Sequence, residues 1–333
     1  MGNGAAHGHG RPAPLRSTVL PFTADGPSAP APERQRLIDG PDGPGRPIAL
    51  RTWGDPRLPV LVLVHGYPDT SRTWDKVAPL LARRFHVVAY DVRGAGDSQI
   101  PRRLADYKLA RLTADFEAVI QAVSPDQPVH LVAHDWGSLQ GWEFVTEPRL
   151  AGRIASYTSC SGPCLDHIGH WIRRRLAEPS LKHTGQLLKQ AAKSWYVGVF
   201  HLPLLPAALW RVLLGPLWPQ WMRFAEGARV EACPSQASNG VHGMKLYRAN
   251  VLPRLLNPRQ RVAHAPVQVL EPVRDRYVSP MLNDDLGRWV PQLIRKQIDG
   301  GHWVIASQPE VFAGHVLAHI AQISHPAGTG QTN

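Results

Sequence analysis

Cysteine is scarce in this sequence, and long hydrophobic runs are absent. Three of the 333 residues are cysteines, and Cys160 and Cys164 do not have CxxC spacing, so the sequence predicts neither a disulfide framework nor a zinc site. No apolar run reaches the roughly 18 residues of a membrane-spanning helix. The first residues lack the apolar segment of a secretory signal, and Ala6 replaces the Ser or Thr of a myristoylation signal. We therefore expect a cytoplasmic protein without an integral membrane segment or a bound metal.

Positive charge exceeds negative charge, but no nucleic-acid-binding motif accompanies the excess. The formal net charge is +11, from 37 Lys and Arg against 26 Asp and Glu. A basic protein can attract nucleic acid, an anionic membrane surface or acidic substrates. The arginines lie in small scattered groups, so we expect no nucleic-acid partner. Weak attraction to an anionic surface stays open.

Glycine, proline and alanine dominate the first residues, and the last ten residues have a similar composition. Such segments bury too little apolar surface to offset the loss of chain entropy. The sequence therefore predicts a disordered tail over residues 1–32 and a flexible tail over 324–333.

Short apolar runs alternate with helical patterns between these tails. Residues 60–64 read VLVLV, which is typical of a strand buried on both faces of a parallel sheet. Further strands are expected at 47–53, 85–90, 129–133, 154–158, 267–270 and 293–298. Helices are expected at 74–82, 109–123 and 137–146. This alternation predicts an α/β fold, with a parallel sheet covered by helices on both faces.

One long segment breaks the alternation. Residues 165–256 carry no strand signal, are rich in Leu, Trp, Arg and Pro, and have a helical pattern. Roughly ninety residues are too many for a simple connection between two core strands. We expect an inserted helical cap above the ends of the strands, where α/β sheets bind ligands. The core would then consist of residues 33–164 and 257–323.

A tight strand-to-helix turn is expected within VHLVAHDWGS, residues 129–138, with Asp135 at its centre. The pattern is that of the G-x-S-x-G nucleophile elbow, with Ala133 for the first Gly and Asp135 for Ser. A serine would need a histidine to remove its proton and would attack an acyl carbon. A carboxylate can attack a saturated carbon directly and form an alkyl ester. Asp135 is thus a predicted nucleophile toward an epoxide or an alkyl halide, unless it only caps the following helix.

An acid and a histidine follow in the chain order that this kind of site uses. Asp275 comes after the strand in PVQVLEPV, and His302 comes after the strand in LIRKQIDGG. Asp275 would orient His302 and stabilise its protonated form, while His302 would activate water. Glu271, Asp284 and Asp285 are competing acids, but their positions relative to the strand end favour Asp275.

Two backbone N–H groups are needed to stabilise the oxyanion of ester hydrolysis. We expect them from Trp136, directly after Asp135, and from Tyr67 in the loop that follows residues 60–64. The alternative for this loop is an ordinary strand-ending turn. The residues expected to contact the substrate are His65, Pro68, Trp136 and Trp303.

Together these segments resemble the epoxide hydrolases of the α/β-hydrolase fold. The matching motifs are HGYP at 65–68, DVRGAGDS at 91–98, HDWGS at 134–138, RDRYV at 274–278 and GGHW at 300–303. The resemblance extends over residues 34–323 and is strongest to actinobacterial members joined to a short-chain dehydrogenase. It implies an α/β-hydrolase fold with a mostly parallel eight-stranded sheet and a helical cap. No G-x-G-x-x-G fingerprint follows a strand, so we expect a stand-alone hydrolase without a cofactor.

The resemblance also implies two cap tyrosines that hold and protonate the epoxide oxygen. SWYVGVFHLP places the first at Tyr196, and GMKLYRAN places the second at Tyr247. A phenol can donate a hydrogen bond without carrying charge into an apolar pocket. The alternative for each tyrosine is a cap aromatic that only packs. Tyr67 departs from the family pattern, in which Phe is commoner at this position.

The sequence therefore predicts an epoxide hydrolase that uses water to convert a small hydrophobic epoxide into a vicinal diol. A haloalkane or haloacid dehalogenase is the alternative enzyme, because it uses the same three residues but binds its halide with N–H donors. A ligand-sensing protein that retains the fold is a third possibility. A hydrophobic substrate is suggested by the cap tryptophans, unless these form the cap's own core: Trp171, Trp195, Trp210, Trp218 and Trp221. A homodimer is possible.

Overall fold

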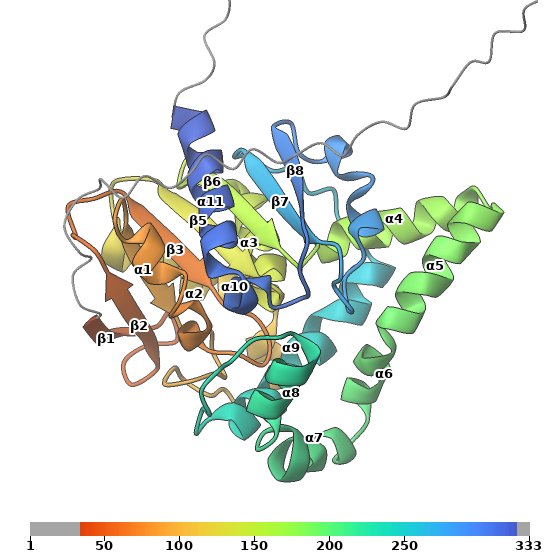
Figure 1. Ribbon diagram of the computed structural model, residues 1–333, viewed down its shortest axis with the longest axis horizontal. Helices are drawn as coiled ribbons and strands as arrows, with labels where there is room; N and C mark the ends of the chain where they lie inside the picture. Colours follow the sequence, from red (N-terminus) through yellow and green to blue (C-terminus); the bar gives the residue numbers. More distant parts are fainter. Residues whose placement is uncertain (1–33, 325–333) are drawn as a thin grey trace, which may run out of the picture.

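The computed structural model describes residues 34–324. Of the predicted tails, residues 1–32 and 325–333 lie outside the described residues, whereas Ser324, which was expected to begin the flexible tail, is the last residue of a helix. Figure 1 shows a central sheet with helices on both sides, and a group of helices that extends away from one end of the sheet.

An eight-stranded sheet forms the centre of the fold, in the order β1-β2-β4-β3-β5-β6-β7-β8. Neighbouring strands from β4 to β8 pair in parallel, whereas β1 and β2 are antiparallel to their neighbours. The mostly parallel eight-stranded sheet is therefore confirmed. The strands are β1 (Arg34–Asp39), β2 (Pro47–Trp53), β3 (Val60–Val64), β4 (His86–Tyr90), β5 (Val129–His134), β6 (Ile154–Cys160), β7 (Val267–Pro272) and β8 (Leu293–Ile298).

Residues on β3 alternate between the two faces of the sheet. Val62 and Val64 pack into a cluster with α2 (Leu109–Val123) and α3 (Trp136–Val145). Leu61 and Leu63 pack on the other side with α1 (Ala78–Leu81), α10 (Val304–Ser307) and α11 (Pro309–Ser324). Because successive side chains of a strand point to opposite faces, both faces of β3 are covered by helices.

The helix expected at residues 74–82 is wrong in length. A 3₁₀ turn occupies Ser71–Trp74, and the α-helix is confined to Ala78–Leu81. Pro79 lies in the first turn of α1, where its missing N–H costs nothing, so it favours a helix that begins here rather than one that continues through it.

The register of the parallel strands brings their carboxyl ends to one edge of the sheet. Val64 lies beside Tyr90 and Ala133, His134 lies beside Cys160, and Pro272 lies beside Ile298. The loops that leave β3, β5, β7 and β8 therefore meet at this edge. The expected nucleophile, acid and histidine follow β5, β7 and β8, whereas Tyr196 and Tyr247 lie on α6 (Trp195–His201) and α9 (Gln236–Leu256).

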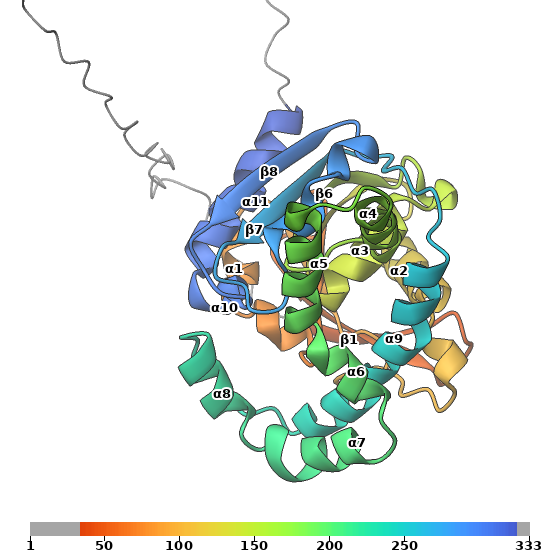
Figure 2. The same cartoon turned by 90° about the vertical axis from the view of Figure 1, so that its right-hand side faces the viewer.

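The described chain between β6 and β7 forms helices and the loops that join them. Figures 1 and 2 show α5, α6 and α7 as a continuous outer row, with α4 and α9 nearer to the sheet. The helices are α4 (Leu165–Ala177), α5 (Leu181–Lys193), α6 (Trp195–His201), α7 (Leu205–Leu209), α8 (Trp218–Ala225) and α9 (Gln236–Leu256), and a π-helical turn, Trp210–Leu214, follows α7. The segment expected to be helical consists of these helices, apart from the connections between them, of which residues 226–235 between α8 and α9 form no helix.

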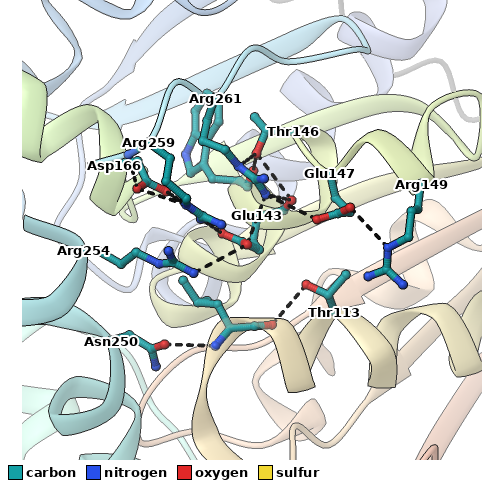
Figure 3. A network of polar contacts seen from close by, with 12 residues as sticks. Thr113, Glu143, Thr146, Glu147, Arg149, Asp166, Asn250, Arg254, Arg259 and Arg261 are labelled. Atoms are coloured by element: carbon teal, nitrogen blue, oxygen red, sulfur yellow. Dashed lines mark hydrogen bonds and ion pairs between the residues drawn. The ribbon is translucent and has the colours of Figure 1, made fainter. Parts of the chain in front are cut away.

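A buried ion-pair network joins α3 and α4 to the segment that leads into β7 (Figure 3). The side chain of Glu143 on α3 is only 5% exposed and accepts a hydrogen bond of 2.6 Å from Arg259. Arg259 also pairs with Asp166 on α4 at 2.7 Å, and Arg261 lies 3.1 Å from Glu143. These contacts hold both ends of the inserted helices against the core.

Replacing Glu143 by Gln is expected to lower the free energy of unfolding by about 3 kcal/mol, because it removes the buried carboxylate that pairs with Arg259 and Arg261 and leaves the largely buried Arg261 with the longer contact of 3.8 Å to Glu147. Urea denaturation followed by circular dichroism measures this change. Glu117→Gln is the matched control, since Glu117 forms a more exposed pair with Arg149 at 3.4 Å and should lose at most about 0.5 kcal/mol. Equal stability of the two variants would contradict a structural role for the network.

Candidate active site

Asp135 occupies the turn between β5 and α3 in a backbone conformation that is rare for a residue with a side chain. Its φ is 51° and its ψ is −123°. Such a conformation costs on the order of 1–3 kcal/mol and persists only where the surroundings impose it. A Cβ on Gly137 would lie 2.1 Å from the carbonyl oxygen of Val64, so the close approach of the turn to β3 requires glycine. The sharp elbow expected from the sequence is present.

His302 lies between two carboxylates. Its Nε2 is 3.4 Å from Oδ2 of Asp135, and its Nδ1 is 2.9 Å from Oδ2 of Asp275. The other oxygen of Asp275 accepts hydrogen bonds from the backbone N–H groups of Tyr277 and Val278, at 2.8 and 2.9 Å. The structure thus brings together the predicted nucleophile, histidine and acid from the loops after β5, β8 and β7.

The competing acids are engaged elsewhere. Glu271 accepts hydrogen bonds from Asn283 and Arg295. Asp284 and Asp285 form ion pairs with arginines of α4. Among the candidate acids that the sequence left open, Asp275 is the one hydrogen-bonded to His302.

The two carboxylates set the protonation of His302. Burial alone would lower the pKa of the imidazole, but Asp275 and Asp135 outweigh burial and raise it to about 10. Burial opposes ionisation of Asp275 as well, but the charge and hydrogen bond of His302, together with the two backbone N–H groups, lower the pKa of Asp275. At neutral pH the unreacted site therefore holds a protonated His302.

The loop after β3 supplies a hydrogen-bond donor to Asp135. The backbone N–H of Tyr67 donates to Oδ1 of Asp135 at 2.6 Å. The Tyr67 ring packs edge-to-face against Phe200, Trp210 and Tyr247, and its hydroxyl donates to the carbonyl oxygen of Gly240. Trp136, which follows Asp135, begins α3. The oxyanion roles of Tyr67 and Trp136 stay predictions, and this geometry is compatible with both.

A cavity of about 560 Å³ opens beside Asp135. Trp136, Tyr196, Tyr247 and Tyr277 line it, together with aliphatic side chains of α4, α5 and α9. The rings of Tyr196 and Tyr247 lie 5.9 Å apart and nearly perpendicular. Burial raises the pKa of both phenols above the usual value of 10, so both stay protonated and able to donate.

Three residues expected to contact the substrate are not among those that line this cavity: His65, Pro68 and Trp303. His65 Nε2 accepts from the Val92 N–H, and its Nδ1 donates to the carbonyl oxygen of Gly66, so the ring braces its own loop. Pro68 accepts a hydrogen bond from Gln236 of α9. Trp303 packs beside His302 with ring centroids 4.6 Å apart. Their assignment as substrate contacts stays a prediction.

Sequence reasoning missed three polar groups around this centre. Tyr277 stacks edge-to-face on His302, and its place two residues after Asp275 was the available signal. Asp69 accepts a hydrogen bond from the Trp303 indole, and burial raises the pKa of its carboxyl to about 7. Glu226 accepts from the Trp303 backbone N–H, and burial raises its pKa as well. Glu226 lies just after α8, and no local motif marks it.

Within residues 34–324, no group of three or more His, Cys, Asp or Glu side chains is arranged to hold a metal ion. Burial raises the pKa of the Cys160 and Cys164 thiols to about 12, so neither is a thiolate at neutral pH. The chemistry that this centre can perform is that of a carboxylate, an imidazole and neutral phenols.

The family described as alpha/beta hydrolase fold matches residues 59–191. A solved epoxide hydrolase variant from Bacillus megaterium, bound to its diol product, superposes with a TM-score of 0.70 at 19% identity over 86% of this chain and 100% of its own. With the elbow, the acid and the histidine in this arrangement, the chain has the α/β-hydrolase fold.

Curated proteins with related sequences match most of this chain. A protein named probable oxidoreductase EphD from Mycobacterium tuberculosis is 36% identical over 304 residues, which cover 89% of this chain and 51% of that protein. Epoxide hydrolase 3 from Mus musculus is 25% identical over 279 residues, which cover 80% of this chain and 71% of the mouse protein. The chain therefore spans about half the length of the EphD protein that it matches.

Proposed function

We propose that the protein is an epoxide hydrolase, which opens a hydrophobic epoxide to a vicinal diol through an ester of Asp135. The observation that carries the proposal is that the carboxylate of Asp135 shares one largely apolar cavity with the phenols of Tyr196 and Tyr247. A carboxylate supplies the nucleophile, and a neutral phenol supplies the proton that the opening ring needs. The named epoxide hydrolases among its relatives support the same reaction.

Ring opening is the first step. Tyr67 holds Oδ1 of Asp135, so Oδ2 is left to attack a carbon of the epoxide. A bond forms between Oδ2 and this carbon while the bond from the carbon to the epoxide oxygen breaks. The departing oxygen takes a proton from the phenol of Tyr196 or Tyr247 and becomes the first hydroxyl of the product.

Ester formation prepares His302 for the second step. The ester has no charge, so one of the two carboxylates that raise the pKa of His302 is lost. The imidazolium then gives up its proton, which returns to the phenolate left by ring opening, and the neutral ring removes a proton from water. The resulting hydroxide attacks the carbonyl carbon of the ester, the N–H groups of Tyr67 and Trp136 stabilise the oxyanion, and its collapse releases the diol and restores the carboxylate.

A single turnover in water labelled with heavy oxygen tests this sequence of steps. Hydroxide adds to the carboxyl carbon, so the label is expected in the peptide that contains Asp135 and not in the first diol released. Mass spectrometry of the digested protein and of the product distinguishes the two locations. Label in the first diol with none in Asp135 would mean that water attacks the epoxide directly, and the ester mechanism would be wrong.

The phenols distinguish this reaction from dehalogenation by the same three residues. A dehalogenase needs N–H donors for the halide, whereas Asp135 here shares its cavity with two phenols, and the ring of Trp136 packs edge-to-face on Tyr247. Changing both Tyr196 and Tyr247 to Phe is expected to lower epoxide turnover at least 100-fold, since proton donation contributes about 10²–10⁴ to a rate. Retained epoxide turnover in this variant would contradict the assignment of the phenols, and halide release from a haloalkane by the wild type would favour the dehalogenase.

The location and assembly of the protein also stay proposals. A cytoplasmic location is supported by the three free cysteines, Cys160, Cys164 and Cys233. A homodimer stays an expectation from the sequence.

A further inference from the structure

An unusually apolar surface is exposed on the outer helices of the insertion. We name the exposed side of α5 to α8 the outer cap face. Neither α5 nor α6 contains a fully buried residue, and Leu181, Val212 and Phe224 are 96%, 79% and 84% exposed. Trp195 and Trp221 are exposed as well, at 69% and 45%. Single exposed apolar side chains are ordinary, but a concentration of them marks an interaction surface.

The same segment carries only positive charge. Between Glu178 and Glu226 the sequence contains no Asp or Glu, whereas it contains five Lys and Arg residues: Lys182, Lys189, Lys193, Arg211 and Arg223. Four of them are exposed, and Lys193 is partly buried. Elsewhere in the described chain basic residues are commonly paired with acids, as Arg174 and Arg175 are with Asp285. Apolar and aromatic groups surrounded by unopposed cations are typical of elements that lie in the interface of an anionic lipid bilayer.

The cavity beside Asp135 continues toward this part of the surface. Leu176 on α4 and Leu252 on α9 line the cavity, and both are more than half exposed, at 64% and 52%. Leu187 and Ala191 of α5 line the same cavity. A mostly apolar lining thus joins the insertion surface to Asp135, with Ser161, Gln190 and Ser194 as polar members of the same cavity wall.

We propose that the outer cap face binds to the surface of an anionic lipid bilayer and that the cavity opens toward the bound lipid. The binding follows from the charge and the exposed apolar groups. Delivery of a lipid-dissolved epoxide to Asp135 rests in addition on the proposed function. The helices lie on the surface rather than across it: no single described helix is long and apolar enough to span a membrane, although α6 with Leu205–Leu214, bent by 102°, meets that test as a pair.

A second copy of the chain fits this face less well than lipid does. In a twofold interface the same patch meets itself. The acid-free segment would then place its cations against those of the partner, and like charges oppose such contact. An anionic bilayer offers both an apolar layer and the complementary charge.

Sedimentation with vesicles tests the charge component. The probe is phosphatidylcholine vesicles with about a third of the lipid as phosphatidylglycerol, compared with phosphatidylcholine alone. Wild-type protein is expected to bind the anionic vesicles about 10-fold more strongly, and high salt should weaken this binding. Removing four cap charges should reduce binding about 10-fold, in a variant with Lys182→Gln, Lys189→Gln, Arg211→Gln and Arg223→Gln. The matched control loses four exposed core charges and should bind like wild type: Arg34→Gln, Arg84→Gln, Arg102→Gln and Lys108→Gln.

A second pair of variants tests the apolar component. Leu181→Ser, Val212→Ser and Phe224→Ser together should reduce vesicle binding about 10-fold. The control carries three such changes at exposed core positions and should bind normally: Leu37→Ser, Ile100→Ser and Leu104→Ser. Both variants should fold, because the changed side chains are exposed. Thermal unfolding checks this.

The outcomes separate the alternatives. Absence of wild-type binding, or equal losses in cap and core variants, would overturn the proposal. A dimer in solution that the cap serine variant converts to a monomer would assign this face to self-association and would also overturn it. Diol formation from a water-soluble epoxide is measured in parallel. Normal diol formation without vesicle binding refutes the membrane surface alone, whereas vesicle binding without any diol refutes the proposed function alone.

Discussion

Asp135→Asn is expected to abolish epoxide turnover, with a loss of at least about 10⁴-fold in kcat, as for other enzymes that lose their nucleophile. The amide has the shape of the carboxylate but is a far weaker nucleophile toward a saturated carbon. The turn should survive, because asparagine tolerates the positive φ of 51° better than most residues. Steady-state formation of diol measures the effect.

The same variant changes the charge around His302. The Asp135 carboxylate is one of the two groups that raise the His302 pKa, so Asp135→Asn should bring it below its value of about 10. Titration of the imidazole by NMR detects this change and serves as a second readout, independent of turnover. Asp97→Asn is the control, since Asp97 is exposed and the substitution removes the same charge without touching the site. Diol formation at the wild-type rate by Asp135→Asn would remove the basis of the proposed mechanism.

The centre of the site could be predicted from the sequence because it depends on strand ends. Apolar patterning predicted seven of the eight strands, most clearly the continuous run of β3, although β8 reads LIRKQI and is apolar only in part. Parallel strands place the loops that follow them at one edge. Asp135, Asp275 and His302 each follow such a run closely, so their convergence is a consequence of the topology. The strand that was missed, β1, reads RQRLID and is mostly exposed, and it therefore lacks the apolar run on which the prediction depended.

The residues that surround Asp135, Asp275 and His302 could not be predicted in the same way, because their positions depend on contacts between segments that are distant in the sequence. His65 is an expected substrate contact, and the sequence did not reveal that both of its nitrogens also brace the loop, through Gly66 and Val92. The Trp303 indole is held by Asp69, 234 residues away in sequence. Hydrophobicity and spacing along the chain contain no information about such pairs.

The cap tryptophans illustrate the same limit within one segment. The sequence left open whether they line the pocket or pack within the cap. Trp171 lines the cavity, whereas Trp210 is buried against Tyr67 and Trp218. Trp195 and Trp221 do neither and are exposed. An amphipathic pattern predicts which face of a helix is apolar but not what covers that face. The exposure of the outer cap face could therefore be recognised only in the structure.

His302→Gln is expected to trap the ester that the proposed mechanism requires. Glutamine can still hydrogen-bond in the space beside Asp275, but its amide cannot take a proton from water. Ring opening needs Asp135 and a phenol, so the first step should proceed, while the second should slow by at least about 10³-fold. Intact-protein mass spectrometry after mixing with an epoxide should then show a mass increase equal to that of the epoxide.

The control for this trap is the double variant Asp135→Asn with His302→Gln, which should show no mass increase. A mass increase that persists in the double variant would mean that another nucleophile is alkylated. Loss of turnover in His302→Gln without any adduct would mean that His302 acts before the ester forms. The trap therefore tests the order of the two steps. In the unreacted structure His302 lies 3.4 Å from Asp135 and 2.9 Å from Asp275, so both carboxylates act on the imidazole before the ester forms. Asp135 must lose its charge to an alkyl group before His302 can give up its proton and act as a base.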